Sequence, residues 1–130
     1  MMHRVIGNGV IDPPERFLVD GNPVGGEYGD KTGVYTYVGM EPWLPGFNEI
    51  LVPRYRRAGE DGSSIGDAYI EWSPLVEVWS IMLVSDTPPF NWIGWSTDGD
   101  AGTLEGGPLS ADQPWEGVDP NTGSATLVRL

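Results

Sequence analysis

One stretch in the middle of the chain constrains the fold more than any other. Residues 66–96, GDAYIEWSPLVEVWSIMLVSDTPPFNWIGWS, hold four of the six tryptophans and the densest run of β-branched and aromatic residues. Such residues favour strands whose side chains pack on one another. Any core of this protein must therefore be built around this stretch.

Two apolar segments in this stretch flank a Ser-Pro turn. Residues 65–72 alternate apolar and polar side chains, which predicts a strand with one buried face and one solvated face that carries Glu71. Residues 75–84 are apolar at alternate positions on both faces, which predicts a central strand of the sheet. Trp72 and Trp79 are accordingly expected in the core.

Shorter strand candidates recur about every ten residues between turn signals. They are predicted at residues 16–19, 33–39, 47–55, 90–96 and 125–130. Pro53 cannot donate a ladder hydrogen bond, so its strand is expected to lie at a sheet edge or to end there. No window shows helical apolar periodicity over ten residues without a glycine or proline.

This spacing of short strands predicts an all-β fold, a small antiparallel sandwich or barrel with extended terminal arms and long Gly/Pro-rich loops. Glycine and proline make up about a quarter of the 130 residues, which agrees with many turns. Residues 1–15 are expected as an N-terminal arm that frays or lies on a neighbour. Residues 16–130 are expected as one β domain in which residues 97–124 are mostly loop.

The charge of the chain limits its partners. The formal net charge is −12, with 19 acidic residues against 7 basic ones. Binding to nucleic acid or to an anionic membrane depends on Lys and Arg side chains that replace counterions, so neither partner is expected. The chain has no cysteine, which excludes a disulfide framework. No signal peptide or transmembrane helix is expected, because no apolar run has the length that either requires.

Catalytic chemistry finds little support in the residues. The one histidine, His3, stands in the least structured part of the chain, which disfavours a nucleophile activated by histidine. Glu49, Glu71 and Glu77 are strand-borne candidates for a pair of catalytic carboxylates, but 19 acids produce such pairs freely, and solvated strand faces are the favoured interpretation. The protein is therefore expected not to be an enzyme.

No metal or cofactor is expected either. Asp98-Gly99-Asp100 with Glu105 resembles part of a calcium loop, yet a third oxygen ligand and the glycine position of the consensus are missing. An ordinary acidic turn is the favoured interpretation. The glycines of residues 21–26 do not lead into a helix, so they do not form a phosphate loop.

Two groups of residues are candidates for partner binding. Trp43 and Trp115 stand in proline-containing loops, where an indole can stack on a sugar ring or fill a pocket of a partner. Arg54, Arg56 and Arg57 form the basic cluster of an acidic chain. They are expected either to pair within the molecule or to dock on an acidic neighbour.

The order of short motifs resembles a small β module of structural proteins of tailed bacteriophages and other aquatic viruses. The motifs, which span residues 32–117, are Gly33-x-Tyr35 with Gly39, Pro53-x-Tyr55, Ile70-x-Trp72, Trp79-x-Ile81, Trp95-Ser96, Pro108 and Trp115. The usual pattern of the module has Asn where this chain has Thr32, and residues 41–48 look like an insertion. These departures concern the first strand more than the central hairpin.

The resemblance implies a virion component without catalytic residues. The expected function is a non-enzymatic structural protein of the virion, most specifically a capsid cement or decoration protein. It would self-associate, with a trimer favoured, and dock on a capsid or tail protein. The alternative is a carbohydrate-binding module or a receptor-binding piece of a tail fibre that uses loop tryptophans to hold a glycan. A small carboxylate enzyme is the third hypothesis.

Overall fold

The structure is a computed structural model of the chain. It describes residues 4–6, 10–12, 14–21, 24–25, 30–43, 50–84, 92–93, 100–117 and 121–130. Of the single residues named above, His3, Glu49, Trp95, Ser96, Asp98 and Gly99 lie outside the described residues, as does most of the strand expected at residues 90–96.

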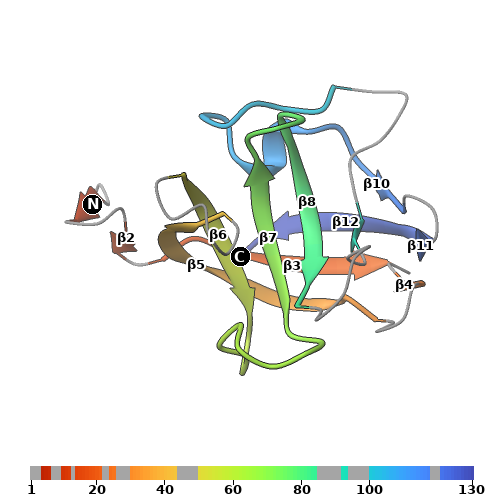
Figure 1. The fold of residues 1–130 in the computed structure, drawn as a ribbon. Coiled ribbons are helices and arrows are strands. Elements are labelled where there is room, and N and C mark those ends of the chain that lie inside the picture. Colours follow the sequence, from red (N-terminus) through yellow and green to blue (C-terminus); the bar gives the residue numbers. More distant parts are fainter. Residues whose placement is uncertain are drawn as a thin grey trace.

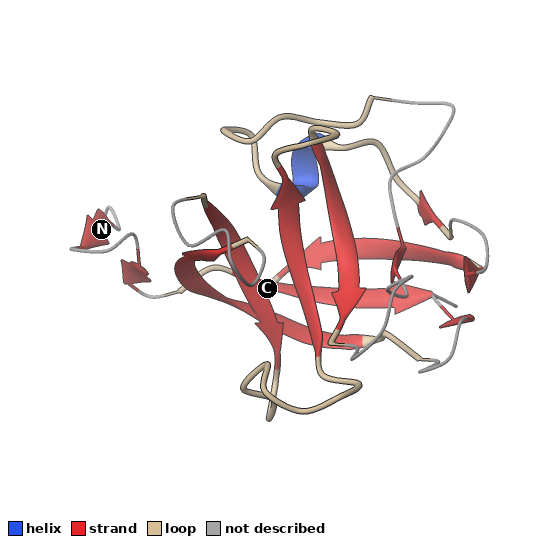
Figure 2. Ribbon diagram, in the orientation of Figure 1, coloured by secondary structure: helices blue, strands red, loops and turns tan. Residues whose placement is uncertain are grey.

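Short strands make up nearly all regular structure in the described ranges (Figure 2). The strands are β1 (Arg4–Ile6), β2 (Val10–Asp12), β3 (Arg16–Gly21), β4 (Val24–Gly25), β5 (Gly33–Pro42), β6 (Leu51–Arg57), β7 (Ala68–Ser73), β8 (Val78–Leu83), β9 (Trp92–Ile93), β10 (Trp115–Glu116), β11 (Asn121–Thr122) and β12 (Ser124–Arg129). In the described parts of the chain the one helical segment is a 3₁₀ turn, η1 (Pro108–Ser110). The predicted all-β class is confirmed.

Eight of the strands form one antiparallel sheet that curls into a half-barrel. Their order is β10-β12-β3-β5-β6-β7-β8-β9. Figure 1 shows β7 and β8 crossing β3, β5 and β12 at a steep angle, so that the two halves of the sheet face each other across the core. Two further pairs, β1 with β2 and β4 with β11, form separate two-stranded sheets.

The central hairpin of the sheet matches the predicted one. Strand β7 pairs with β8 in a register that places Ile70 opposite Ile81 and Trp72 opposite Trp79. These four side chains are buried, and the two indoles meet edge to face with ring centroids 5.5 Å apart. Tyr55 of β6 packs on Trp79 at 6.2 Å. Burial of these aromatic and aliphatic side chains removes apolar surface from water, which stabilises the hairpin.

The other half of the core comes from strands far away in the sequence. Side chains of β3, β5, β10 and β12 pack against those of β7 and β8. They are Phe17, Val19, Tyr35, Tyr37, Trp115, Ala125 and Leu127. The predicted alternation of residues 33–39 is confirmed, because Tyr35 and Tyr37 both face the core.

The turn between β7 and β8 is longer than the sequence predicts. Strand β8 begins at Val78 and not at Leu75, because residues 74–77 form a turn in which the Glu77 amide donates to the Ser73 carbonyl oxygen at 2.8 Å. Glu77 adopts a left-handed backbone with φ of 57°. As a result Leu75 and Val76 stand in the exposed turn and not in the strand.

A β-bulge in β5 changes the face on which its residues lie. Tyr37 pairs with Tyr55, but the next pair is Gly39 with Arg54, so Val38 is an extra residue. Gly39 has φ of 104°, which a glycine adopts without strain. Odd-numbered residues that face the core before the bulge face outward after it. Glu41 therefore lies on the outer face, where Arg54 and Arg56 also lie.

Pro53 stands inside an interior strand, so its expected position at an edge or at a strand end is wrong. Strand β6 lies between β5 and β7. The physical reason is local, because pairing with β7 covers Arg54 to Arg56 and stops before Pro53, whose partner on β5 is Met40. Among the described residues no strand pairs with Pro53 on the β7 side, so the missing amide costs no ladder bond to them there.

Candidate functional site

Three exposed large aliphatic side chains belong to two segments at one end of the sheet. Leu75 and Val76 stand in the β7–β8 turn with exposed fractions of 77% and 58%, and Leu104 stands in the loop of residues 100–107 at 41%. Figure 1 shows this turn and this loop at the same end of the sheet. We call Leu75, Val76 and Leu104 the aliphatic tip. Exposed apolar surface that gathers in one place is typical of a binding surface.

A cleft of about 330 Å³ lies next to the aliphatic tip. The described residues that line it come from two segments, Trp72 and Glu77 from the β7–β8 hairpin and Gly102, Thr103, Leu104 and Glu105 from the loop. Both walls thus carry a carboxylate, and Trp72 contributes an aromatic surface. The volume falls at the small end of ordinary ligand sites, which range over roughly 300–1,000 Å³.

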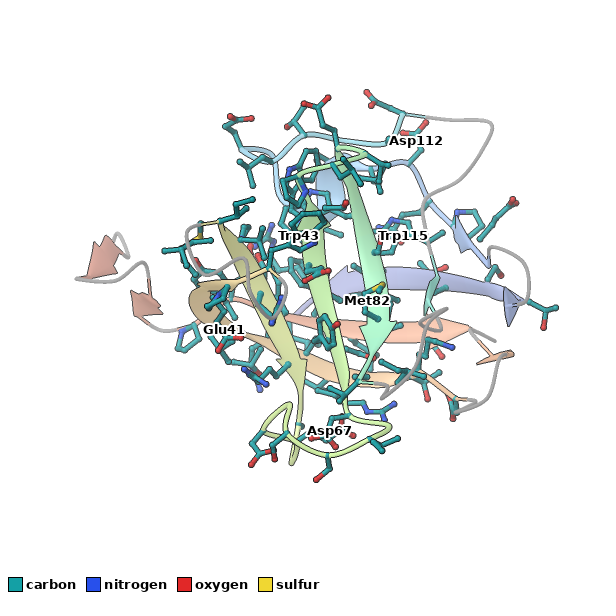
Figure 3. All side chains as sticks on the ribbon, viewed as in Figure 1. Glu41, Trp43, Asp67, Met82, Asp112 and Trp115 are labelled. Atoms are coloured by element: carbon teal, nitrogen blue, oxygen red, sulfur yellow. The ribbon has the colours of Figure 1, made fainter. Side chains whose placement is uncertain are left out.

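The loop wall of the cleft is held in place by hydrogen bonds. The indole N–H of Trp79 donates to the Thr103 carbonyl oxygen at 2.9 Å, and the Thr103 amide donates to Ser110 Oγ at 2.9 Å. At the base of the loop the Asp112 amide donates to the Asp100 carbonyl oxygen at 2.8 Å. Figure 3 labels Asp112 at this end of the sheet and Asp67 at the other end. The cleft is therefore preformed, which lowers the entropic cost of binding.

Gly102 provides a test of this loop because Gly59 is a matched control. Both glycines have φ of 82°, but a Cβ at Gly102 would meet Ser110 Oγ at 2.6 Å and the Ala111 amide nitrogen at 2.7 Å, whereas nothing lies within 4 Å at Gly59. We expect Gly59→Ala to lower the free energy of unfolding by about 1 kcal/mol, from backbone strain alone. Gly102→Ala should cost roughly 1–2 kcal/mol more, since backbone strain is joined by overlap.

Urea denaturation of both variants measures this difference. The NMR signal of the Trp79 indole N–H should shift in Gly102→Ala and stay in place in Gly59→Ala. Equal losses of stability in the two variants would show that the loop changes its conformation to accommodate a Cβ at residue 102 and that the cleft is not preformed.

A second cluster of functional groups lies on the outer face of the sheet. Arg54 Nη2 lies 2.5 Å from Glu71 Oε1, and Arg54 Nη1 lies 3.6 Å from Glu41 Oε1. Arg56 Nη2 donates to both oxygens of Glu41 at 2.6 and 2.7 Å. The guanidinium of Arg54 also stacks over Tyr69, with Cζ 4.7 Å from the ring centroid. We call Arg54, Arg56, Glu41 and Glu71 the arginine–glutamate cluster.

Glu71 does not lie on a solvated face, as the strand pattern predicts, but is buried with 4% of its surface exposed. Burial raises its pKa, and this effect outweighs the neighbouring Arg54, which lowers it. Arg54 has a buried Nε without a hydrogen-bond partner. Within the cluster, Arg54 and Glu71 therefore form a buried ion pair whose charges are costly to separate.

Arg57 belongs to a different set of contacts. Its Nε donates to Glu60 Oε2 at 2.7 Å, and its Nη1 donates to the Asp30 carbonyl oxygen at 2.9 Å. Lys31, the one lysine in the sequence, is fully buried beside this set, and burial lowers its pKa. Arg54, Arg56 and Arg57 thus all pair within the molecule, the first of the two uses that the sequence left open.

The two candidate tryptophans lie in different surroundings. Trp115 is fully buried in the core, so its indole is not part of an exposed surface, contrary to its expected place at an interface. Strand β10 brings it there by pairing Trp115 with Ala125 of β12. Trp43 is half-buried just after β5, and its carbonyl oxygen accepts a hydrogen bond from Arg54 Nη2 at 3.4 Å. Figure 3 labels both side chains.

The carboxylate candidates do not form a catalytic pair in the described part of the chain. Glu71 is held by Arg54 in the arginine–glutamate cluster, and Glu77 is exposed at the cleft. Asp100 accepts a hydrogen bond from the Gly102 amide at 2.9 Å, as in an ordinary acidic turn. The described residues hold no group of three or more histidine, aspartate or glutamate side chains that could bind a metal ion. They also contain no helix of the length and apolarity that a membrane span requires.

Sequence reasoning missed the cleft and the aliphatic tip. Both depend on the exact end of β7 and on a loop that returns to it from about thirty residues away, and no local pattern reports either. The one available signal is the Leu-Val pair after Ser-Pro, which fits an exposed turn as well as the start of a strand.

Comparison of the chain with protein-family models, with curated proteins and with solved structures finds no match.

Proposed function

We propose that the protein is a non-enzymatic structural protein that docks on another protein through the aliphatic tip. The observation that carries this proposal is the exposure of Leu75, Val76 and Leu104 around a preformed cleft. A binding surface of this kind gains affinity by removing apolar side chains from water, and a rigid frame limits the ordering cost.

The partner surface is expected to be apolar and basic. The chain carries a net charge of −12, and the cleft beside the tip is lined by Glu77 and Glu105. Charge complementarity favours a basic partner and disfavours a second copy of the same acidic tip. We therefore propose that a different protein, and not a second copy of this chain, binds the aliphatic tip. Self-association, for which a closed trimer is the expected form, would use other surfaces.

The most specific form of the proposal is a virion component, a cement or decoration protein on a capsid or a tail-associated protein. It is supported by the likeness of the Ile-x-Trp and Trp-x-Ile hairpin to the viral β module, whose two strands pair here as that likeness implies. A glycan-binding role is the alternative. It has less support, because one of its loop tryptophans, Trp115, is buried in the core.

Serine substitutions in the tip test the docking proposal. We expect Leu75→Ser and Val76→Ser each to weaken sedimentation with isolated capsids of tailed bacteriophages roughly tenfold, since each removes one buried aliphatic side chain from the interface. Ile65→Ser is the matched control, because Ile65 is 55% exposed and precedes β7, whereas the tip follows it. It should leave docking unchanged.

Mass in solution by light scattering measures self-association in the same samples. The proposal is wrong if the protein stays monomeric, does not bind the capsids and changes its tryptophan fluorescence when an oligosaccharide is added. This result would favour a glycan-binding module. Equal effects of Ile65→Ser and Val76→Ser would show that the tip is not the docking surface.

A further inference from the structure

The cleft beside the aliphatic tip has the chemistry of a cation site. Among the described residues that line it, the charged side chains are Glu77 on the hairpin wall and Glu105 on the loop wall, and no basic side chain lines it. The cleft therefore carries an uncompensated negative charge. A carboxylate on each of two walls favours a cation that can reach both.

Trp72 adds a second preference for a cation. Its indole lines the cleft and is held at an edge-to-face angle of 65° by Trp79. The face of an indole attracts a guanidinium or ammonium group through its quadrupole. Trp72 is 8% exposed, so it offers a cation a small contact area at the wall of the cleft and offers a sugar no broad ring on which to stack.

The shape of the cleft favours one side chain over a larger ligand. A volume of about 330 Å³ is at the lower limit of ligand sites. Its position beside Leu75, Val76 and Leu104 means that a partner seated on the aliphatic tip would present its own side chains to the cleft. A guanidinium is planar and can donate to two carboxylates at once, which an ammonium does less well.

We propose that the cleft binds an arginine side chain that the docked partner protein supplies, with Glu77 and Glu105 as its carboxylate ligands and Trp72 as its aromatic wall. This inference rests on the proposed docking function. It goes further than that function because it names arginine as the basic residue of the partner and the cleft as the place where that residue binds.

The test uses the whole protein and N-acetyl-L-arginine amide as the probe. The probe is titrated while amide and indole NMR signals are followed, with N-acetyl-L-citrulline amide as the neutral control of the same shape. We expect saturable shifts at the Trp72 indole N–H and the Gly102 amide with the arginine probe and none with the citrulline probe. Added salt should weaken the binding.

Charge-neutral variants of the cleft sharpen the test. Glu77→Gln and Glu105→Gln should each weaken probe binding about two- to fivefold, and the double variant should remove it. Asp20→Asn, which removes one exposed acid from β3, is the matched control and should bind as the parent does. Binding that persists in the double variant, or equal binding of citrulline or of a neutral oligosaccharide, would overturn the inference.

The two proposals fail in different ways. Capsid binding that depends on Leu75 and Val76 but is unchanged in the Glu77→Gln/Glu105→Gln variant would overturn the arginine site and leave docking intact. If the protein binds the arginine probe at the cleft but binds no capsid protein, the docking function is wrong. The arginine of a docked partner is then also excluded as the natural ligand of the cleft.

Discussion

Replacing Trp79 with alanine is expected to lower the free energy of unfolding by about 3–5 kcal/mol, the usual range for truncating a large buried aromatic side chain. Trp79 is almost fully buried and packs on both Trp72 and Tyr55. Its indole N–H also holds the loop at Thr103. The substitution therefore opens a cavity in the centre of the half-barrel and releases one wall of the cleft. Urea denaturation followed by circular dichroism measures the loss.

Trp79→Phe separates the two roles of this side chain. Phenylalanine keeps much of the buried aromatic area but cannot donate to the Thr103 carbonyl oxygen, so a smaller loss of roughly 1–3 kcal/mol is expected. A Trp79→Ala protein that keeps the stability of the parent and loses only partner binding would contradict the structural role of the hairpin.

Replacing Arg54 with alanine is expected to cost about 3–5 kcal/mol, because it leaves the Glu71 carboxylate buried without its partner. Arg54 and Glu71 expose only 13% and 5% of their side chains, and their charged atoms lie 2.5 Å apart. Glu41 is less affected, since Arg56 still donates to both of its oxygens. Thermal or urea unfolding at neutral pH measures the loss.

The matched control is an exposed ion pair. Arg129 pairs with Glu15 but exposes 55% of its side chain, so Arg129→Ala should cost less than about 1 kcal/mol. The double variant Arg54→Met/Glu71→Leu should recover most of the lost stability, because it removes both buried charges together. If Arg54→Ala and Arg129→Ala cost the same, the arginine–glutamate cluster is not a buried ion pair.

The cost of Arg54→Ala should also depend on pH. In the folded protein burial raises the pKa of Glu71 above its ordinary value of 4.5, so the contribution of Glu71 to stability is greatest below that value and is lost as the pH rises through the folded pKa. Removal of Arg54 takes away the charge that opposes this rise. The difference in the free energy of unfolding between Arg54→Ala and the parent should therefore become smaller as the pH falls from about 7 to about 4, because Glu71 takes up a proton over this range.

Local patterns predict much of the half-barrel correctly. Alternation of side chains places Tyr35 and Tyr37 on one face of β5, and the run from Val78 to Leu83, which is rich in apolar residues on both faces, is buried except at Met82, which is half-buried. Such patterns are readable because successive side chains of a strand point to opposite faces, whatever the strand pairs with. The central hairpin, from Ile70-x-Trp72 to Trp79-x-Ile81, follows from the sequence for the same reason.

Local patterns do not predict the candidate sites, because these depend on pairs of segments far apart in the chain. The bulge at Gly39 moves Glu41 to the face of Arg54, and the register of β6 with β7 places Arg54 opposite Glu71. Neither can be read from a single strand. Trp115 looks like a loop residue in a polar stretch, yet the pairing of β10 with β12 places it in the core.

The all-β class, the hairpin at the centre of the core and the acidic charge can be predicted from the amino-acid sequence, because composition and side-chain alternation act within a few residues. Which exposed residues lie at the same end of the sheet depends on how distant segments fold together. The return of residues 100–107 to the end of β7 places Leu104 at the same end of the sheet as Leu75 and Val76 and forms a cleft that Glu77 and Glu105 line. That return depends on the Trp79 indole, which reaches a carbonyl group 24 residues away, and such long-range pairing leaves no periodic signal in the chain.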